Sequence, residues 1–180
     1  RAGVLDTTLD ILGSVNPDTG KGEAKIHISE DGLSTAVVDP ANVSMAFIEI
    51  APAAFETLPE GGQITLGTNL ERLSDLIGKA NASDTVWLGY NTETRKLSIS
   101  YRNISGSMAL IDPESIRQEP DTPDLDLPNR VTLPPGELSD AIDMVELVDT
   151  QATISCDSDT ETLTVSAHGD TDDVSVELGA

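Results

Sequence analysis

The chain has 180 residues and a formal net charge of −22, because it carries 32 acidic residues and only 10 basic ones. Aromatic residues make up 3% of the chain, so its core must consist mainly of Leu, Ile, Val and Ala. The absence of a long apolar run argues against a membrane-spanning helix, and a single cysteine excludes an internal disulfide framework.

The acidic residues are dispersed along the chain, unlike those of an acidic disordered tail. Self-repulsion among so many carboxylates destabilises a compact chain in ordinary salt. At molar salt the Debye length falls to about 3 Å and the repulsion is largely screened. The composition therefore predicts a protein from a high-salt cytoplasm. An acidic secreted domain is the alternative that composition leaves open.

The first part of the chain is predicted to hold a helix and then paired strands. Apolar residues at helical spacing predict a helix at 4–14, followed by a Gly- and Asp-rich loop at 16–22. Two strands follow, joined at Glu30-Asp31-Gly32, where Asp-Gly favours a tight hairpin turn. Pro40 fixes its own φ and biases Asp39 away from helix, so residues 39–42 are predicted to turn.

The same pattern then repeats along the chain. Strands are expected at 43–50 and 63–67, and Asn69 is a plausible N-cap for a helix that runs to Lys79. The remaining strands of this part are expected at 85–91, 96–101 and 105–111. Beyond the linker described below, a strand at 130–133, a helix at 137–148 and strands at 151–156, 162–167 and 173–178 are expected.

A unit of helix, strand, turn and strand thus recurs three times, which constrains architecture more than any isolated residue does. The apolar helix stripes are Leu5, Leu9 and Leu12; Leu70, Leu73, Leu76 and Ile77; and Leu138, Ile142 and Val145. Residues 113–128 carry four prolines and many acids without periodicity, which is typical of an extended linker. The repeat predicts an α+β chain with domains at 1–112 and 129–180, the second of them incomplete.

The chain lacks the residue patterns typical of catalysis, such as a Gly-rich phosphate loop, a Ser/His/Asp arrangement or a metal-binding HExxH helix. Cys156 is expected to be structural, since the sequence places neither His27 nor His168 beside it. Alternating acids at 157, 159 and 161 lack the glycine and distal glutamate of an EF-hand, so they are expected to be acidic turns. We expect no enzyme activity, no cofactor and no metal site.

Three segments resemble the archaeal and eukaryotic sliding clamp family, proliferating cell nuclear antigen (PCNA), and its haloarchaeal members above all. They are GLSTAVVDPANVSMAFIEI from Gly32, NLERLSDLIGKA from Asn69 and MALIDPESIRQEPDTPDLDLP from Met108. The resemblance implies the DNA clamp (processivity) fold, with two helix-and-sheet units per domain and two domains per subunit. Measured against that family, the first short strand and the second half of the second domain are missing. The chain is therefore expected to be a fragment or a truncated relative.

The resemblance also implies a function: a homotrimeric ring around duplex DNA, in the cytoplasm and associated with the nucleoid. Its partners would be DNA polymerase, flap endonuclease, DNA ligase and the clamp loader, replication factor C. Two alternatives stay open. One is a divergent clamp relative that binds DNA weakly, and the other is an acidic extracellular calcium-binding or adhesion β-domain.

Three sets of site residues follow from the resemblance. A partner-peptide pocket beneath the linker would comprise Val38, Asn42, Val43, Met45, Ile116, Pro120, Pro123 and Leu125. Edge strands of neighbouring subunits would pair through Ser105, Ser107, Met108 and Leu110 on one side and Val174, Val176 and Leu178 on the other.

DNA phosphates require Lys or Arg on the inward helix faces, and here only Arg72 and Lys79 remain. Any DNA contact is therefore expected to be loose. From the residues alone, a plain structural role remains open for each of the three sets. The edge strands can be ordinary ones, the linker can pack on its own domain, and Arg72 and Lys79 can be solvated helix charges.

Overall fold

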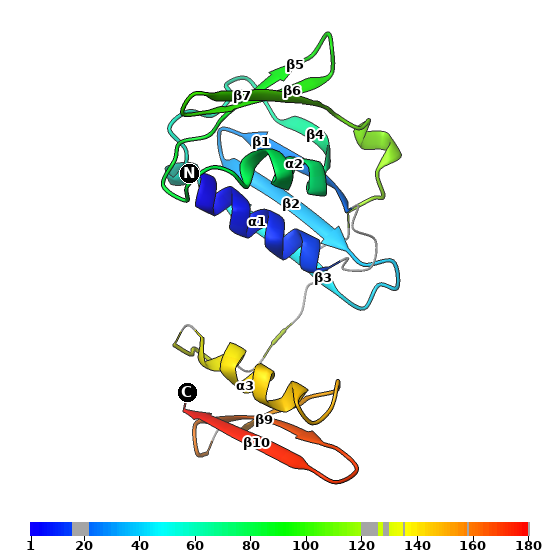
Figure 1. The fold of residues 1–180 in the computed structure, drawn as a ribbon, viewed down its shortest axis with the longest axis vertical. Coiled ribbons are helices and arrows are strands. Elements are labelled where there is room, and N and C mark those ends of the chain that lie inside the picture. Colours follow the sequence, from blue (N-terminus) through cyan, green and yellow to red (C-terminus); the bar gives the residue numbers. More distant parts are fainter. Residues whose placement is uncertain (16–21, 120–125, 128–129, 135, 158, 180) are drawn as a thin grey trace. The chain divides into compact units, whose positions relative to one another are not determined.

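The computed structural model describes residues 1–15, 22–119, 126–127, 130–134, 136–157 and 159–179 (Figure 1). The chain divides into two compact units, Arg1–Pro123 and Asp124–Ala180. Each unit has a hydrophobic core of its own. Among the described residues, no helix is both long enough and apolar enough to span a membrane.

The first unit opens with helix α1 and a four-stranded antiparallel sheet in the order β3-β2-β1-β4. A two-residue turn joins β1 to β2, because Ser29 pairs with Gly32 across Glu30 and Asp31. Helix α2 follows directly from β4 and lies beside α1 over the same sheet (Figure 1). The bounds are α1 Ala2–Ser14, β1 Glu23–Ser29, β2 Gly32–Val38, β3 Met45–Ile50, β4 Ile64–Asn69 and α2 Leu70–Ile77.

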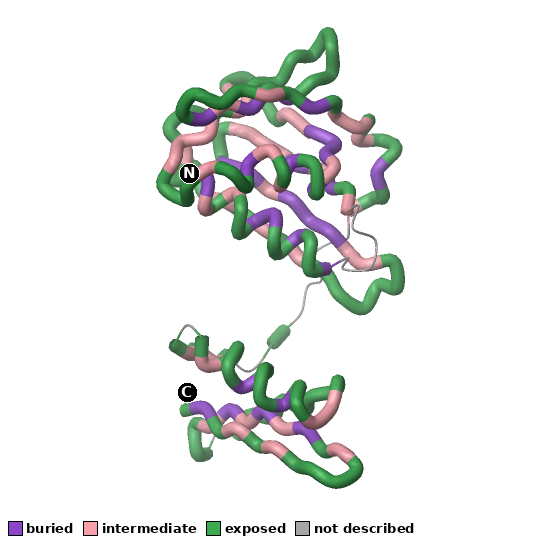
Figure 2. Tube along the Cα trace, in the orientation of Figure 1, coloured by how far each residue is buried: buried purple, intermediate pink, exposed green. Residues whose placement is uncertain are grey.

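A second, three-stranded sheet completes the first unit, in the order β5-β6-β7. Its strands are β5 Trp87–Asn91, β6 Lys96–Tyr101 and β7 Ile104–Ala109. The core lies between the two helices and the two sheets, as the buried segments in Figure 2 show. Leu9 and Leu12 from α1 meet Leu73 and Ile77 from α2 there, which confirms the apolar stripes of both helices.

The second unit contains helix α3 (Glu137–Glu146) packed on a three-stranded sheet in the order β10-β9-β8. The strands are β8 Thr153–Asp157, β9 Thr162–His168 and β10 Asp173–Gly179. Its core is small and contains Ala141 and Val145 from the helix and Val165 from the central strand. The predicted α+β class is confirmed, and so are the repeated units of a helix and an antiparallel sheet.

Several predicted details are wrong. Residues 130–133 form no strand: Val131 and Leu133 pack against the second core, but this stretch pairs with no described strand. The stripe of α3 is also different, because Leu138 and Ile142 are 38% and 37% exposed while Ala141 is buried. In the described part of the second unit α3 is the only helix on this sheet, so no neighbouring helix there buries its flank, unlike α1 and α2.

Several element boundaries differ by one or two residues, and two of them bear on the predicted site residues. Helix α2 ends at Ile77, with Gly78 as its C-cap, so Lys79 lies in the turn beyond the helix. Strand β3 begins at Met45 because Val43 and Ser44 belong to the preceding turn, which Asp39 organises. Residues 16–21 of the predicted loop at 16–22 and most of the linker's second half lie outside the described residues.

Candidate partner-docking site

A short segment, residues 111–119, crosses the four-stranded sheet of the first unit. We call this segment the strap. It leaves the end of β7, and the Ile111 amide donates to the Gly67 carbonyl of β4 at 2.8 Å. The Asp112 side chain then accepts from the Glu114 amide and starts a 3-10 turn at Pro113–Ser115. Ile116 follows and is only 7% exposed.

Gly67 is the contact point that lets the strap lie close to the sheet. A Cβ atom at this position would stand 2.3 Å from the Ile111 carbonyl oxygen and 3.0 Å from the end of Ile116. Only a residue without a side chain leaves room for both. Ile116 thus anchors the strap from beneath rather than offering an exposed surface.

The strap lies on the face of the four-stranded sheet that points away from α1 and α2, here called the outer face. Residues that pair directly across an antiparallel sheet share one face. Ile26, Leu66 and Thr35 form one such row and are buried on the helix side. The neighbouring row, which includes His27 and Thr65, therefore belongs to the outer face.

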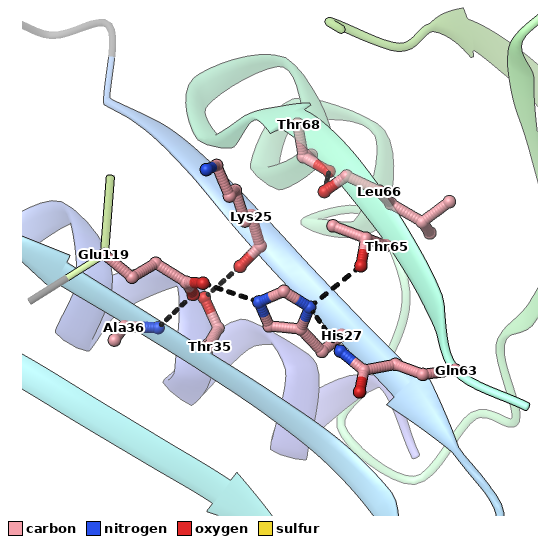
Figure 3. A network of polar contacts seen from close by, with 9 residues as sticks. All are labelled: Lys25, His27, Thr35, Ala36, Gln63, Thr65, Leu66, Thr68 and Glu119. Carbon is pink, nitrogen blue, oxygen red and sulfur yellow. Dashed lines mark hydrogen bonds and ion pairs between the residues drawn. The ribbon is translucent and has the colours of Figure 1, made fainter. Parts of the chain in front are cut away.

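A polar cluster on the outer face holds the end of the strap (Figure 3). The Nε2 atom of His27 lies 2.6 Å from Oε2 of Glu119. The other ring nitrogen, Nδ1, lies 2.7 Å from Nε2 of Gln63 and 3.0 Å from Oγ1 of Thr65. The side chains of His27 and Glu119 are 20% and 25% exposed, so water screens their contact only in part.

The second oxygen of Glu119 serves a different strand. The β1–β2 ladder ends at the pair Ile26 and Thr35. The backbone amide of the next residue of β2 therefore lies outside this ladder. This amide, from Ala36, donates to Oε1 of Glu119 at 3.3 Å. One carboxylate therefore contacts both β1 and β2.

A second fastening joins the strap to the turn between β2 and β3. The Arg117 guanidinium donates to the Asp39 carbonyl at 3.0 Å and to Oδ1 of Asn42 at 2.6 Å. The Asp39 carboxylate accepts from the amides of Val43, Ser44 and Ala41 at 2.7, 2.8 and 3.0 Å. These bonds, first that from Ser44, hold the pKa of Asp39 below its ordinary value.

Apolar side chains gather beside this fastened turn. Val43, Met45 and Phe47 are 85%, 44% and 53% exposed. Met45 pairs with the half-buried Val38 across the β2–β3 ladder. Neighbouring exposed apolar side chains of this kind are a feature of interaction surfaces. We call Val38, Val43, Met45 and Phe47 the β2–β3 patch.

The predicted pocket residues are brought together in part. Val38, Asn42, Val43 and Met45 lie on the β2–β3 turn and its flanking strands, next to the strap residue Arg117. Ile116 is buried beneath the strap. Pro120, Pro123 and Leu125 lie outside the described residues.

The predicted interface residues lie on two edge strands, β7 in the first unit and β10 in the second, except Leu110, which directly follows β7. Ser105 and Ser107 are exposed on β7, whereas Met108 is 2% exposed and belongs to the core. Leu110 packs partly against that core. On β10, Leu178 is buried, and Val174 and Val176 pack partly on the second core. Pairing through these edges would therefore use main-chain groups and the serine side chains.

The predicted DNA contacts are sparse. Arg72 is exposed on α2 and is the only Lys or Arg within the α-helices of the described residues. Lys79 is exposed in the turn after α2, where its carbonyl accepts from Arg102. Arg102 itself pairs with Asp84 at 3.0 Å. The helix surface of the described residues thus offers phosphates very little positive charge.

Sequence reasoning missed Phe47, Arg117, Glu119 and His27. Phe47 was detectable, because it continues the alternation of Val43 and Met45 on a strand. The other three were not: 92 residues separate His27 from Glu119, and 75 separate Arg117 from Asn42. Only the packing of the strap brings them together.

Comparisons of this chain with known proteins all find the same kind of protein. The family profile described as "Proliferating cell nuclear antigen, N-terminal domain" matches residues 9–109. The DNA polymerase sliding clamp of Haloarcula marismortui is 43% identical over 177 residues, which are 98% of this chain and 69% of that protein. The sliding clamp of Natronomonas pharaonis is 42% identical over 156 residues, 87% of this chain and 63% of the relative.

Solved structures show the same likeness. A structure of A. fulgidus PCNA bound to the C-terminal region of FEN-1 superposes with a TM-score of 0.89 at 29% sequence identity. The superposition covers 99% of this chain and 69% of that one. The chain therefore spans between about three fifths and seven tenths of the length of these relatives.

Proposed function

Since the chain belongs to the proliferating cell nuclear antigen family of sliding clamps, we propose that it acts as part of a DNA sliding clamp subunit. Such a subunit contributes to a homotrimeric ring that encircles duplex DNA and tethers replication and repair enzymes. Sliding clamps are non-enzymatic processivity factors, in agreement with the expectation that the chain is not an enzyme. Because the chain belongs to this family, we do not retain the alternative of an extracellular calcium-binding or adhesion β-domain.

Partner docking is the part of this function that the geometry supports best, and one observation carries it. The strap is fastened by Arg117 to the turn that presents the exposed β2–β3 patch. A solved relative, A. fulgidus PCNA, is bound to the C-terminal region of FEN-1. We take the patch and the strap to be the corresponding docking surface for peptides of flap endonuclease, DNA polymerase, DNA ligase and clamp loader.

Ring formation would use the open edges of β7 and β10. Each strand has a neighbour on one side only in the described sheets, and an open edge offers unpaired N–H and C=O groups to another chain. In this proposal the domains span 1–112 and 129–180, and residues 113–128 connect them. The ring would work in the cytoplasm, at the nucleoid.

Contact with DNA would be loose. With Arg72 alone on the described helices and Lys79 in the turn after α2, retention on DNA depends on ring closure rather than on phosphate binding. Molar salt, as in the cytoplasm of a halophile, weakens phosphate contacts but leaves a closed ring in place. The remaining alternative is a divergent relative that docks partners without holding DNA.

A loading assay separates these two functions. The chain is incubated in 2 M KCl with nicked circular DNA and a haloarchaeal clamp loader, and retained protein is measured before and after the circle is linearised. A sliding clamp stays on the circle and runs off the linear form. Absence from both, with a trimer absent in light scattering, would leave only the docking function.

A further inference from the structure

Glu119 is the last described residue of the strap, and its carboxylate joins three elements. It belongs to the strap, its Oε2 atom contacts His27 on β1, and its Oε1 atom contacts the Ala36 amide on β2. Ala36 in turn pairs directly with Phe47 on β3. The carboxylate is therefore fixed one residue pair away from the exposed aromatic side chain of the β2–β3 patch.

The contacts of His27 define its tautomer. An ionised carboxylate only accepts hydrogen bonds, so Nε2 of His27 must carry the proton that points to Glu119. Nδ1 faces the amide nitrogen of Gln63 and the hydroxyl of Thr65, both of which can donate to it. The single lone pair of Nδ1 accepts from one of these two donors at a time, so an imidazole with its proton on Nε2 contacts Glu119 and either Gln63 or Thr65.

Building on the proposed function, we propose that His27 and Glu119 form a clasp that positions the strap for partner docking. The clasp holds the strap against the outer face beside the patch before a partner arrives. An unfastened strap would have to be ordered when the peptide binds, and that ordering costs affinity. His27 is thus a positioning residue, and the partner it serves is an extended peptide with apolar side chains for the patch.

The test measures peptide affinity in three clasp variants: His27→Ala, Glu119→Ala and the double variant. The probe is a fluorescein-labelled peptide from the C-terminal region of A. fulgidus FEN-1, followed by fluorescence polarisation in 2 M KCl. Each single variant is expected to weaken binding by about tenfold, as loss of preorganisation predicts. The double variant should bind no more weakly than Glu119→Ala alone, because Glu119→Ala already removes the contact with His27.

The chain offers a matched control in His168 and Asp173. Their side chains also form a His–carboxylate contact, at 2.9 Å, but they are 72% and 74% exposed and belong to the second unit. His168→Ala should leave affinity unchanged. Thermal unfolding of every variant, with binding measured well below the midpoint, separates a docking effect from loss of folded protein.

Nitrogen NMR of the imidazole gives a readout that a general loss of stability would not produce. In the parent chain His27 should show the Nε2–H tautomer, and in Glu119→Ala it should show a mixture of tautomers. If the parent binds the peptide and the clasp variants bind it equally well, the clasp has no positioning role while the docking function stands. A parent chain that does not bind the peptide at all would overturn both.

Discussion

Gly67 is the residue on which the close approach of the strap depends most directly. In Gly67→Ala the new Cβ would meet the Ile111 carbonyl oxygen at 2.3 Å, so strap or strand must move. We expect a loss of about 1–3 kcal/mol in unfolding free energy, as overpacking of a close contact predicts. Urea denaturation followed by circular dichroism measures it.

Gly13 gives the matching control for that substitution. It lies in α1, and a Cβ there would meet nothing within 4 Å. Gly13→Ala should stabilise the chain by about 0.5 kcal/mol, because alanine favours the helix and restricts the unfolded chain. If Gly67→Ala proved as stable as Gly13→Ala, the strap would not lie where the structure has it.

Asp39 makes the turn beside the patch sensitive to acid. Hydrogen bonds from backbone amides, first that of Ser44, lower the pKa of Asp39 below its ordinary value of 3.8. A lowered pKa means that the carboxylate stabilises the folded turn above that value, and that this contribution is lost as the pH falls through the folded pKa. The amide NMR signals of Val43 and Ser44 should therefore shift with a midpoint below pH 3.8.

Asp39→Asn provides the control for this titration. The amide side chain keeps one oxygen acceptor and cannot ionise, so the same two signals should lose their dependence on pH. A parent midpoint at or above 3.8, or a titration that survives in Asp39→Asn, would show that another group controls the turn.

At the scale of elements, α2 depends on its N-cap. The Asn69 side chain accepts from the Arg72 amide at 2.8 Å, one of the helix N–H groups without a partner inside the helix. Asn69→Ala should cost about 1 kcal/mol in unfolding free energy. Asn69→Asp keeps the acceptor and should retain stability, and equal losses in both variants would argue against capping. Thermal denaturation in constant salt measures both.

The sequence predicted those elements whose formation depends on nearby residues. Periodicity identified the stripes of α1 and α2, Asn69 identified the start of α2, and Asp-Gly identified the β1–β2 turn. It failed for residues 130–133, which have the alternation of a strand but no described strand to pair with. A strand needs a partner, and a partner is a property of the whole sheet.

The candidate docking site was predictable to a smaller extent. A resemblance placed Val38, Asn42, Val43 and Met45 together, and strand alternation could have added Phe47. The fastening contacts of Arg117 and Glu119 could not be predicted, because each joins residues at least 75 positions apart. Local patterns carry no information on contacts that form only when the strap reaches the outer face.

At the scale of the whole molecule, charge should govern stability. A net charge of −22 produces self-repulsion that KCl screens, so the melting temperature should rise steadily between 0.1 and 2 M KCl. Differential scanning calorimetry measures the rise. Sucrose at equal osmolality acts by exclusion from the surface and leaves charges unscreened, so its effect should be smaller. A melting temperature that peaks below 0.2 M KCl would contradict a halophilic origin.

Docking at the β2–β3 patch is the central claim, and two exposed aromatic residues of the first unit test it directly. Phe47 lies in the patch and is 53% exposed, while Trp87 lies on β5 in the other sheet and is 55% exposed. The measurement is the affinity of each alanine variant for the labelled FEN-1 peptide in 2 M KCl. We expect Phe47→Ala to weaken binding at least about tenfold, as loss of a central aromatic contact does. Trp87→Ala should bind like the parent, and the reverse pattern, or equal effects, would contradict the assignment of this surface.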